Sequence, residues 1–284
     1  MKNLSALLQE NRTLIRQRLF LTNERWQKLI CKTTQETKKS NASLGVCKDE
    51  AVWTFLIACG YAISGIEGIE KLTTIITGSS MGQPSDAKIW LEAQLYPSRK
   101  HEGNTSIDLA LGTISLRDGT KGGIELMNCS SSWVCFCEMK WFSDISKETT
   151  HDLHRNQLAR VIENAIFFND KAGCSDQSNV RYPDRIYVAL VTPKVFRDAN
   201  VKSRLYQYKF ENYRADSTYL LNDLESSALE LRDGSAKLAK RLERLSCLCW
   251  STYDDIFAHI PCSAISMELK SFWEKCGNYQ GREL

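Results

Sequence analysis

The sequence predicts an α/β fold in which helices flank a central mixed β-sheet. Apolar residues recur with a period of two over residues 88–96 and 106–111, which is the pattern of half-buried strands. Over residues 150–168 they recur at helical spacing, and residues 186–191 form a near-continuous apolar run typical of a strand buried on both faces. These changes of period along the chain predict one sheet with helices packed against it.

The predicted core follows the order helix, strand, strand, strand, helix, strand. We expect its helices over residues 48–62 and 150–168, and its strands over residues 88–96, 106–117, 132–141 and 185–191. Residues 65–85 contain several Gly, Ser and Thr and are predicted to form a loop region with a short apolar segment at 72–76. Together these elements give a core domain over residues 48–192.

Both ends of the chain are predicted to extend this core. Residues 1–47 are interpreted as a helical extension and linker, with one helix over residues 3–31 and a polar linker over residues 33–41. Residues 193–284 are interpreted as a C-terminal, mainly helical extension.

The C-terminal extension holds two candidates for a nucleic-acid surface. Tyr206, Tyr208 and Phe210 alternate as one face of a strand, although the basic residues interleaved with them would also suit a nucleic-acid backbone. The predicted helix after Gly234 carries basic residues at offsets of three, four and seven, which form one stripe: Lys237, Lys240, Arg241 and Arg244. Such a stripe can bind phosphates or simply form a solvated helix face.

Composition limits the class of protein. The chain has 284 residues, which is enough to bury a sizeable core. Lys and Arg number 37 against 34 Asp and Glu, so the net charge of +3 gives no strong nucleic-acid signal by itself. No apolar run approaches the length of a membrane span, and residues 1–10 lack the long apolar segment of a secretory signal. We therefore expect an intracellular, cytoplasmic protein with no membrane partner.

The chain contains eleven cysteines. Most lie in apolar contexts, as Cys59 does, which predicts reduced core residues rather than disulfides. The pairs Cys135/Cys137 and Cys247/Cys249 are spaced C-x-C, and the sequence has no C-x-x-C. This spacing argues against a zinc or iron–sulfur site.

Two neighbouring predicted strands carry charged residues in otherwise apolar surroundings. Glu138 and Lys140 interrupt one strand-favouring run, and their spacing of two places both side chains on one face. Asp108 interrupts the strand before it. Turn signals at residues 118–119 and 122–123 favour an antiparallel return between the two strands. Asp108 is therefore expected beside Glu138.

Alternation also predicts where the acidic side chains of these strands point. Ile107, Leu109 and Leu111 are expected to share one face of their strand, and Asp108 to point from the other. Glu92 lies opposite the apolar residues of its own strand, where it could reach the site or face solvent, and we expect it to face solvent.

Burying two carboxylates side by side is costly, because their charges repel and both lose hydration. A divalent cation removes this cost, and oxygen ligands with few protein carboxylates suit Mg²⁺ or Mn²⁺. Lys140 would then orient a water and stabilise negative charge on a phosphate. The competing interpretation is an ordinary charged cluster on an exposed edge strand. Val134 and Phe136 share the face of Glu138 and favour a half-buried surface instead.

This arrangement resembles the PD-(D/E)xK nuclease superfamily, which has the restriction-endonuclease-like fold. The signature of that superfamily is an acidic residue on one strand and an acid-x-Lys on the next. Asp108 and Glu138-Met139-Lys140 match it, while Ile107 stands where the family often has proline. The resemblance implies that Asp108 and Glu138 hold Mg²⁺ or Mn²⁺, with the Met139 carbonyl as a further ligand.

The resemblance, which covers residues 48–192, implies two more site residues. Superfamily members often carry an acidic residue on the helix before the sheet and a polar residue, often Gln, on the helix after the acid-x-Lys strand. Glu50 and Gln157 match these positions, although Glu50 would also suit the positive end of its helix dipole. Val161 follows Gln157 at the fourth position, so the Gln-x-x-x-Tyr form of one branch is absent.

The sequence therefore predicts a metal-dependent nuclease that hydrolyses phosphodiester bonds, with DNA favoured over RNA by the resemblance. Two alternatives stay open: a nuclease-like fold that binds nucleic acid without cutting it, and a structural subunit of a larger complex. A homodimer or a partner subunit is compatible with each of these. The expected catalytic residues are Asp108, Glu138, Lys140, Gln157 and Glu50.

Overall fold

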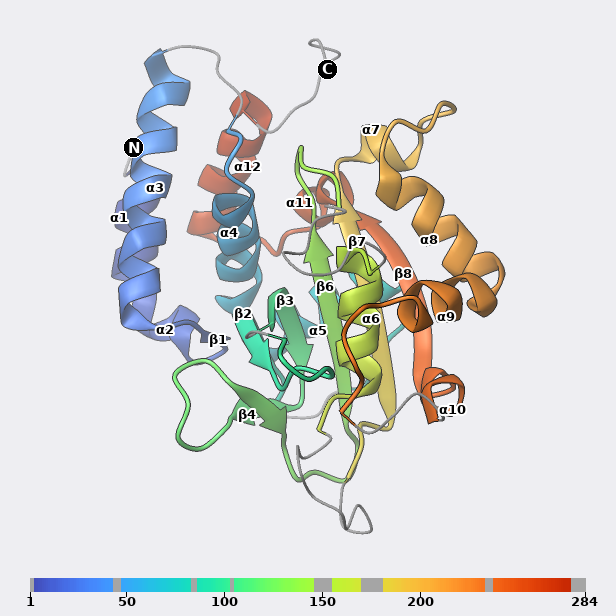
Figure 1. Ribbon diagram of the computed structural model, residues 1–284. Coiled ribbons are helices and arrows are strands. Elements are labelled where there is room, and N and C mark those ends of the chain that lie inside the picture. Colours follow the sequence, from blue (N-terminus) through green and yellow to red (C-terminus); the bar gives the residue numbers. More distant parts are fainter. Residues whose placement is uncertain are drawn as a thin grey trace.

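The computed structural model describes residues 3–42, 47–82, 86–102, 105–145, 155–169, 181–232 and 237–276. At its centre lies a mixed six-stranded sheet with helices on both faces (Figure 1). The predicted α/β class is therefore confirmed. In spatial order the strands are β1 (Leu19–Phe20), β2 (Lys88–Leu95), β3 (Thr105–Gly112), β6 (Trp133–Met139), β7 (Arg185–Thr192) and β8 (Leu245–Thr252).

One strand of the sheet, β3, runs opposite to the other five. β3 runs antiparallel to its neighbours β2 and β6, whereas β1 is parallel to β2, and β6, β7 and β8 are mutually parallel. Between β3 and β6 the chain forms a separate hairpin of β4 (Ile114–Leu116) and β5 (Ile124–Leu126). Its turn contains Gly119 at φ +73°, a backbone conformation that favours glycine. The expected antiparallel return is confirmed, but residues 114–116 leave the main sheet.

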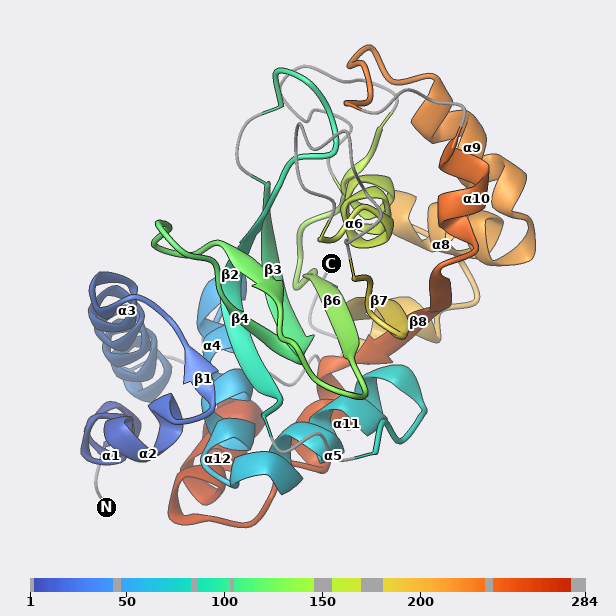
Figure 2. The same cartoon turned by 90° about the horizontal axis from the view of Figure 1, so that it is seen from below.

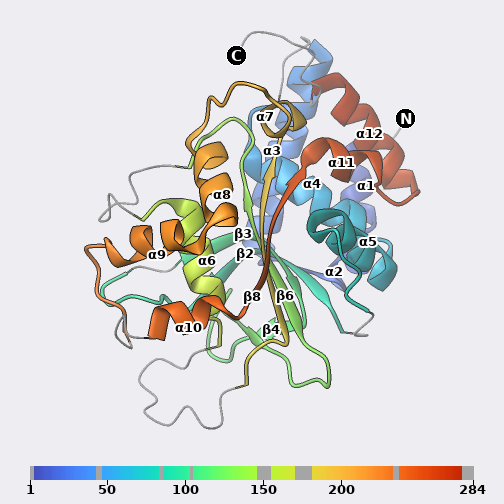
Figure 3. The same ribbon diagram turned by 90° about the vertical axis from the view of Figure 1, so that its right-hand side faces the viewer.

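Helices from both ends of the chain cover one face of the sheet. They are α1 (Leu4–Glu10), α2 (Arg12–Arg16), α3 (Asn23–Ala42), α4 (Glu50–Ala62), α5 (Gly65–Thr77), α11 (Tyr253–Ala258) and α12 (Ala264–Cys276). Figure 3 shows them together on one side of the sheet. With strand residues such as Leu109 and Met139 they form the first core cluster.

The second core cluster lies on the other face of the sheet, where Figure 2 shows α6 and α8–α10 grouped together. It includes strand residues such as Phe136 and Val188. The helices that contribute to it are α6 (Gln157–Ile166), α7 (Lys194–Arg197), α8 (Leu205–Ala215), α9 (Ser217–Glu225) and α10 (Leu238–Leu242).

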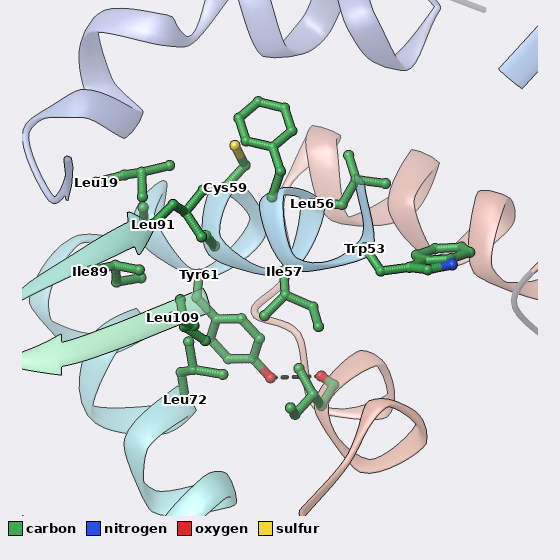
Figure 4. Packing of buried hydrophobic residues seen from close by; sticks show 14 of the residues in the cluster. Leu19, Trp53, Leu56, Ile57, Cys59, Tyr61, Leu72, Ile89, Leu91 and Leu109 are labelled. Atoms are coloured by element: carbon green, nitrogen blue, oxygen red, sulfur yellow. Dashed lines mark hydrogen bonds between the residues drawn. The ribbon is translucent and has the colours of Figure 1, made fainter. Parts of the chain in front are cut away.

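Helix α4 occupies the middle of the first core cluster (Figure 4). Every residue from Val52 to Ala62 is buried, as expected for a helix that is apolar on all sides. The Trp53 ring packs against the rings of Trp141, Phe257, Phe272 and Trp273. At the other end of the helix, the Tyr61 hydroxyl donates a hydrogen bond of 2.7 Å to the main-chain carbonyl of Ile256.

The predicted core elements are present with adjusted ends. The expected helix over residues 48–62 is α4, and the expected strands over residues 88–96, 132–141 and 185–191 are β2, β6 and β7. The expected helix over residues 150–168 is α6, which begins at residue 157 because the Asn156 side chain accepts the Ala159 N–H as a cap. Residues 150–154 lie outside the described residues.

The prediction of a single helix over residues 3–31 is wrong. The chain changes direction at Asn11, whose side-chain amide donates to the Leu7 carbonyl, and again between α2 and α3. Residues 19–20 are extended because they pair in parallel with β2 as strand β1. Pairing with a strand nearly seventy residues away is not visible in a local helical pattern.

The prediction of a linker over residues 33–41 is also wrong, because α3 continues through this segment. Thr33, Thr34 and Thr37 each donate a hydroxyl hydrogen bond to the main-chain carbonyl four residues earlier. These polar side chains are therefore satisfied within the helix, and the polar composition does not require a loop.

The predicted loop region over residues 65–85 contains helix α5. Ile69, Leu72 and Ile76 are buried at helical spacing, and the helix ends at Gly78, which adopts φ +71°. The four glycines of residues 65–85 made this segment look like a loop, although the spacing of its apolar residues is helical.

The alternation of Tyr206, Tyr208 and Phe210 does not mark a strand. These residues lie on α8, where Tyr206, Phe210 and Tyr213 are buried at helical spacing and Tyr208 is exposed. The last strand of the sheet, β8, lies later in the predicted helical extension and pairs in parallel with β7. The assignment of β8 depends on contacts with a distant part of the chain rather than on local period.

The cysteines of the described residues are free thiols. Cys135 Sγ and Cys137 Sγ lie 3.8 Å apart on β6, while β7 separates them from Cys247 and Cys249 on β8. No helix in the part of the chain that the structure describes combines the length and hydropathy of a membrane span.

The buried Tyr61 hydroxyl provides a test of the α4 packing. Tyr61→Phe should lower the free energy of unfolding by about 1–3 kcal/mol, because the Ile256 carbonyl loses its partner in a dry environment. Tyr219→Phe is the matched control, since the Tyr219 side chain is half exposed, and should change stability by less than about 0.5 kcal/mol. Urea denaturation followed by circular dichroism measures both, and equal midpoints for the two variants would contradict the described packing.

Candidate active site

Three carboxylates and one ammonium group meet at the C-terminal end of β6. Glu138 and Lys140 are each only 5% exposed, and Lys140 Nζ lies 2.8 Å from Glu138 Oε1. Lys140 Nζ also lies 3.7 Å from Glu50 Oε1. Asp108, on the adjacent strand β3, accepts a hydrogen bond from the Met139 main-chain N–H at 3.0 Å. The expected proximity of Asp108, Glu138 and Lys140 is present, and Glu50 joins them.

Glu50 is the first residue of α4, but it is not the residue that caps this helix. Asp49 accepts the Val52 N–H at 3.1 Å and forms the N-cap. Glu50 instead accepts the Trp141 main-chain N–H at 2.7 Å and the Ser143 hydroxyl at 3.0 Å. Its side chain therefore fixes the segment after β6 and contributes a carboxylate to the cluster.

Strand register places a fourth acidic residue, Glu92, level with this cluster. Leu109 pairs with both Leu91 and Cys137, so the next positions along the three strands are Glu92, Asp108 and Glu138. Glu92 adopts φ +53°, which is rare for a residue with a side chain. We expected Glu92 to face solvent; its side chain is partly exposed, but it pairs with Arg25 of α3.

The regular alternation of β2 and β3 breaks at these two acidic residues. Ile107 belongs to the second core cluster, whereas Leu109 and Leu111 belong to the first. The expectation that these three side chains share one face is therefore wrong. On β2, Leu91 and Ala93 likewise contribute to opposite faces, on either side of Glu92. The alternation of apolar residues in the sequence cannot reveal such a break, because the break arises from how the two strands pair.

Charge and burial shift the pKa values at this site. Burial and the neighbouring Glu138 carboxylate raise the pKa of Asp108 to about 8, although Lys140 opposes the change. Burial alone would lower the pKa of Lys140, but Glu138, Glu50 and Asp108 together raise it above its ordinary value. Lys140 therefore stays protonated at neutral pH, while Asp108 in the absence of a cation holds a proton.

The donor set fits a divalent cation with oxygen ligands. Asp108 and Glu138 supply carboxylates, and the raised pKa of Asp108 reports the repulsion that such a cation would relieve. In a β-strand, the N–H and the carbonyl of one residue point toward the same neighbouring strand. The Met139 N–H points toward β3, because it donates to Asp108, and the Met139 carbonyl therefore points toward β3 as well. Among the described residues, however, no three acidic, His or Cys side chains are grouped at metal-binding distance.

A small cavity of about 60 Å³ opens beside these carboxylates. Glu50, Glu92 and Asp108 supply its acidic lining, and Thr54 adds a hydroxyl. The sequence predicted Glu50 and Asp108 as site residues, whereas no local signal pointed to Thr54. Thr54 lies one turn after Glu50 on a helix that is otherwise apolar.

Gln157 is the first residue of α6, and its side chain is half-buried. Helix α6 packs on β6 and β7 in the second core cluster, so Gln157 lies on the helix that covers the acid-x-Lys strand. Its part in the site stays a prediction.

The basic residues after Gly234 do not form one exposed stripe. Arg241 is buried, with its guanidinium carbon 3.9 Å from the centre of the Phe167 ring. Arg244 lies over the Tyr182 ring and donates to the Ile166 carbonyl at 3.1 Å. Lys237 and Lys240 are exposed and stay candidates for phosphate binding.

Lys237 and Lys240 lie far from the carboxylate cluster along the strands of the sheet. Helix α10 precedes the first residue of β8, whereas Glu138 is the next-to-last residue of the strand β6, which runs parallel to β8 in the sheet. Lys237 and Lys240 therefore lie at the end of the sheet opposite to Asp108.

Titration of Asp108 should make the stability of the protein depend on pH. The folded pKa of about 8 exceeds the unfolded value of about 3.9, so unfolding releases a proton between these values. Stability from this group is complete below about pH 4 and is lost as the pH rises through about 8. Asp108→Asn removes this loss while keeping the shape of the side chain.

In EDTA, Asp108→Asn should gain stability over the natural protein as the pH rises from 5 to 8, by about 1–3 kcal/mol. The partial exposure of Asp108 reduces the effect below that of a fully buried carboxylate. Urea denaturation at the two pH values measures it. Parallel stability curves for the two proteins would mean that Asp108 has an ordinary pKa.

Comparison of the chain with known protein families, with curated proteins and with solved structures finds no match. The resemblance to the PD-(D/E)xK superfamily therefore depends on the residues of the site and on the order of the core elements.

Proposed function

We propose that this protein is a metal-dependent nuclease of the PD-(D/E)xK type that hydrolyses phosphodiester bonds, with DNA as its substrate. The observation that carries the proposal is the convergence of Glu50, Asp108, Glu138 and Lys140, from three separate elements, at one end of β6. The core order of helix, strand, strand, strand, helix, strand, formed by α4, β2, β3, β6, α6 and β7, also supports it.

Each residue has a distinct role in the proposed reaction. Asp108, Glu138 and the Met139 carbonyl would hold Mg²⁺ or Mn²⁺, which supplies charge neutralisation and acidifies a bound water. The raised pKa of Lys140 keeps its side chain an ammonium, so it cannot accept a proton from water at neutral pH. Its role is to orient the attacking water by hydrogen bonding and to stabilise charge on the phosphate oxygens.

Glu50 acts on the site in two ways. Its contact of 3.7 Å with Lys140 helps to keep the ammonium charged and positioned. Its hydrogen bonds to Trp141 and Ser143 fix the chain immediately after the acid-x-Lys motif. Because α4 is buried along its length, this carboxylate is carried on a rigid element.

Two variants separate metal binding from catalysis. Asp108→Ala should abolish cleavage of plasmid DNA and also weaken Mn²⁺ binding measured by calorimetry, because a metal ligand is lost. Lys140→Met should reduce cleavage by at least about a hundredfold while metal binding stays equal or becomes tighter, because a repelling charge is gone.

The control for these experiments is Lys100→Met, which replaces a lysine that pairs with Glu230 on the surface. It should leave cleavage and metal binding unchanged. A mock purification from cells that lack the protein excludes contaminating nucleases. Full activity in purified Lys140→Met would defeat the catalytic assignment, and DNA binding without cleavage in the natural protein would favour the non-cutting alternative.

A further inference from the structure

A second, larger cavity of about 270 Å³ lies beside the carboxylate cluster. It is bounded by α3, by β2 and β3, and by the tip of the β4–β5 hairpin, and Figures 1 and 2 show the hairpin beside β1 and β2. Leu91 and Glu92 line both this cavity and the small cavity that contains Asp108. The two cavities are therefore neighbours on either side of Glu92.

The lining of the larger cavity is rich in hydrogen-bond donors. Lys28 projects from α3 and Lys121 from the hairpin, while Gln94 and Ser106 are paired positions on β2 and β3. Within the described residues, the side chains of these four make no hydrogen bond or ion pair. Ammonium groups have no acceptor capacity, so the natural complement of this lining is a ligand with several acceptor oxygens.

The charges of the lining favour an anion. Arg25 is occupied by its ion pair with Glu92. Glu24 is the remaining acidic residue of the lining, which also contains two lysines, Lys28 and Lys121. The cavity therefore keeps a net positive charge beside a site whose carboxylates outnumber its single ammonium.

The hairpin tip is held in place before any ligand binds. Gln94 donates its main-chain N–H to the Gly122 carbonyl at 2.9 Å, and Gly123 donates to the Thr120 hydroxyl oxygen at 3.0 Å. A side chain at position 123 would displace the Thr120 hydroxyl and the Arg117 guanidinium group. Lys121 is thus presented to the cavity by a fixed turn, which lowers the entropic cost of binding.

We propose that this cavity binds a backbone phosphate of a DNA strand, next to the phosphate held at the carboxylate cluster. This proposal rests on the proposed nuclease function, for which it names the path of the substrate. Lys28 and Lys121 would contact the phosphate from opposite walls, and Gln94 and Ser106 would donate to it from the sheet. Phe20, stacked on Trp90, also lines the cavity and offers an apolar surface for the attached nucleoside.

The location makes the N-terminal segment part of the substrate site. Phe20 and Lys28 both precede residue 48, outside the region that carries the superfamily resemblance. The same segment supplies Arg25, which holds Glu92 at the boundary between the two cavities. Binding of the DNA substrate by the N-terminal segment would therefore be a property of this chain rather than of the core fold.

Binding of a fluorescein-labelled single-stranded DNA, measured by anisotropy in EDTA, tests the proposal without any need for cleavage. The double variant Lys28→Ala/Lys121→Ala should weaken binding by about tenfold or more and reduce the slope of log K against log salt by about 0.7, because one phosphate is no longer neutralised. Lys28→Arg/Lys121→Arg should keep most of the affinity. The control, Lys71→Ala/Lys270→Ala, removes the same charge from exposed positions on α5 and α12 and should keep the natural salt slope.

The outcomes separate this inference from the proposed nuclease. If the natural protein cleaves DNA through Asp108 but the Lys28→Ala/Lys121→Ala variant keeps its affinity and salt slope, the cavity is not a phosphate site and the nuclease stands. If the natural protein binds through Lys28 and Lys121 but never cleaves with Mg²⁺ or Mn²⁺, the cavity stands and the nuclease fails. Absence of binding by the natural protein, or an equal loss of affinity in the Lys71→Ala/Lys270→Ala control, overturns the cavity proposal.

Discussion

The ammonium group of Lys140 lets three carboxylates approach one another at the end of β6. It contacts Glu138 at 2.8 Å and Glu50 at 3.7 Å, and it opposes the repulsion that raises the pKa of Asp108. This position is possible only because α4 brings Glu50 to the chain segment that follows β6, where Glu50 accepts the Trp141 N–H. The packing of α4 in the first core cluster and the chemistry of the site therefore depend on the same contact.

A second buried charge cluster differs from the site because its positive and negative side chains are equal in number. On the other face of the sheet, Arg155 pairs with Glu102 and with Glu163, and Arg99 also pairs with Glu163. Two guanidinium groups thus face two carboxylates, and the remaining donors of Arg99 reach the Leu224 and Leu229 carbonyls. The cluster at β6 sets one ammonium against three carboxylates. That imbalance of charge is what a divalent cation would correct.

The parts of this structure that local sequence patterns predicted are those that depend on near neighbours. The period of apolar residues located β2, β6, β7 and α4, and the spacing of two residues placed Glu138 and Lys140 on one face. The break at Glu92 and Asp108 could not be predicted, because it arises from how two strands pair. The burial of Arg241 against Phe167 was equally hidden, because an arginine that packs on a ring and one that binds phosphate look the same in a helical stripe.

The same limit explains the errors at the two ends of the chain. Strand β1 exists because residues 19–20 find β2, and β8 exists because it finds β7. Neither strand has a local pattern strong enough to outweigh the helical residues around it. An edge strand forms because it pairs with a neighbouring strand of the sheet, and the sequence of the edge strand alone does not show which strand that is.

The first core cluster joins the beginning and the end of the chain, and this affects how the protein is made. The Cys47 N–H donates to the carbonyl of Cys276 at the end of α12, and Tyr61 is bonded to Ile256. During synthesis Trp53 leaves the ribosome well before Phe272 and Trp273, whose rings cover part of its own ring. Part of the apolar surface of α4 therefore stays uncovered until these residues have been made, and folding waits for long-range contacts rather than for helix formation.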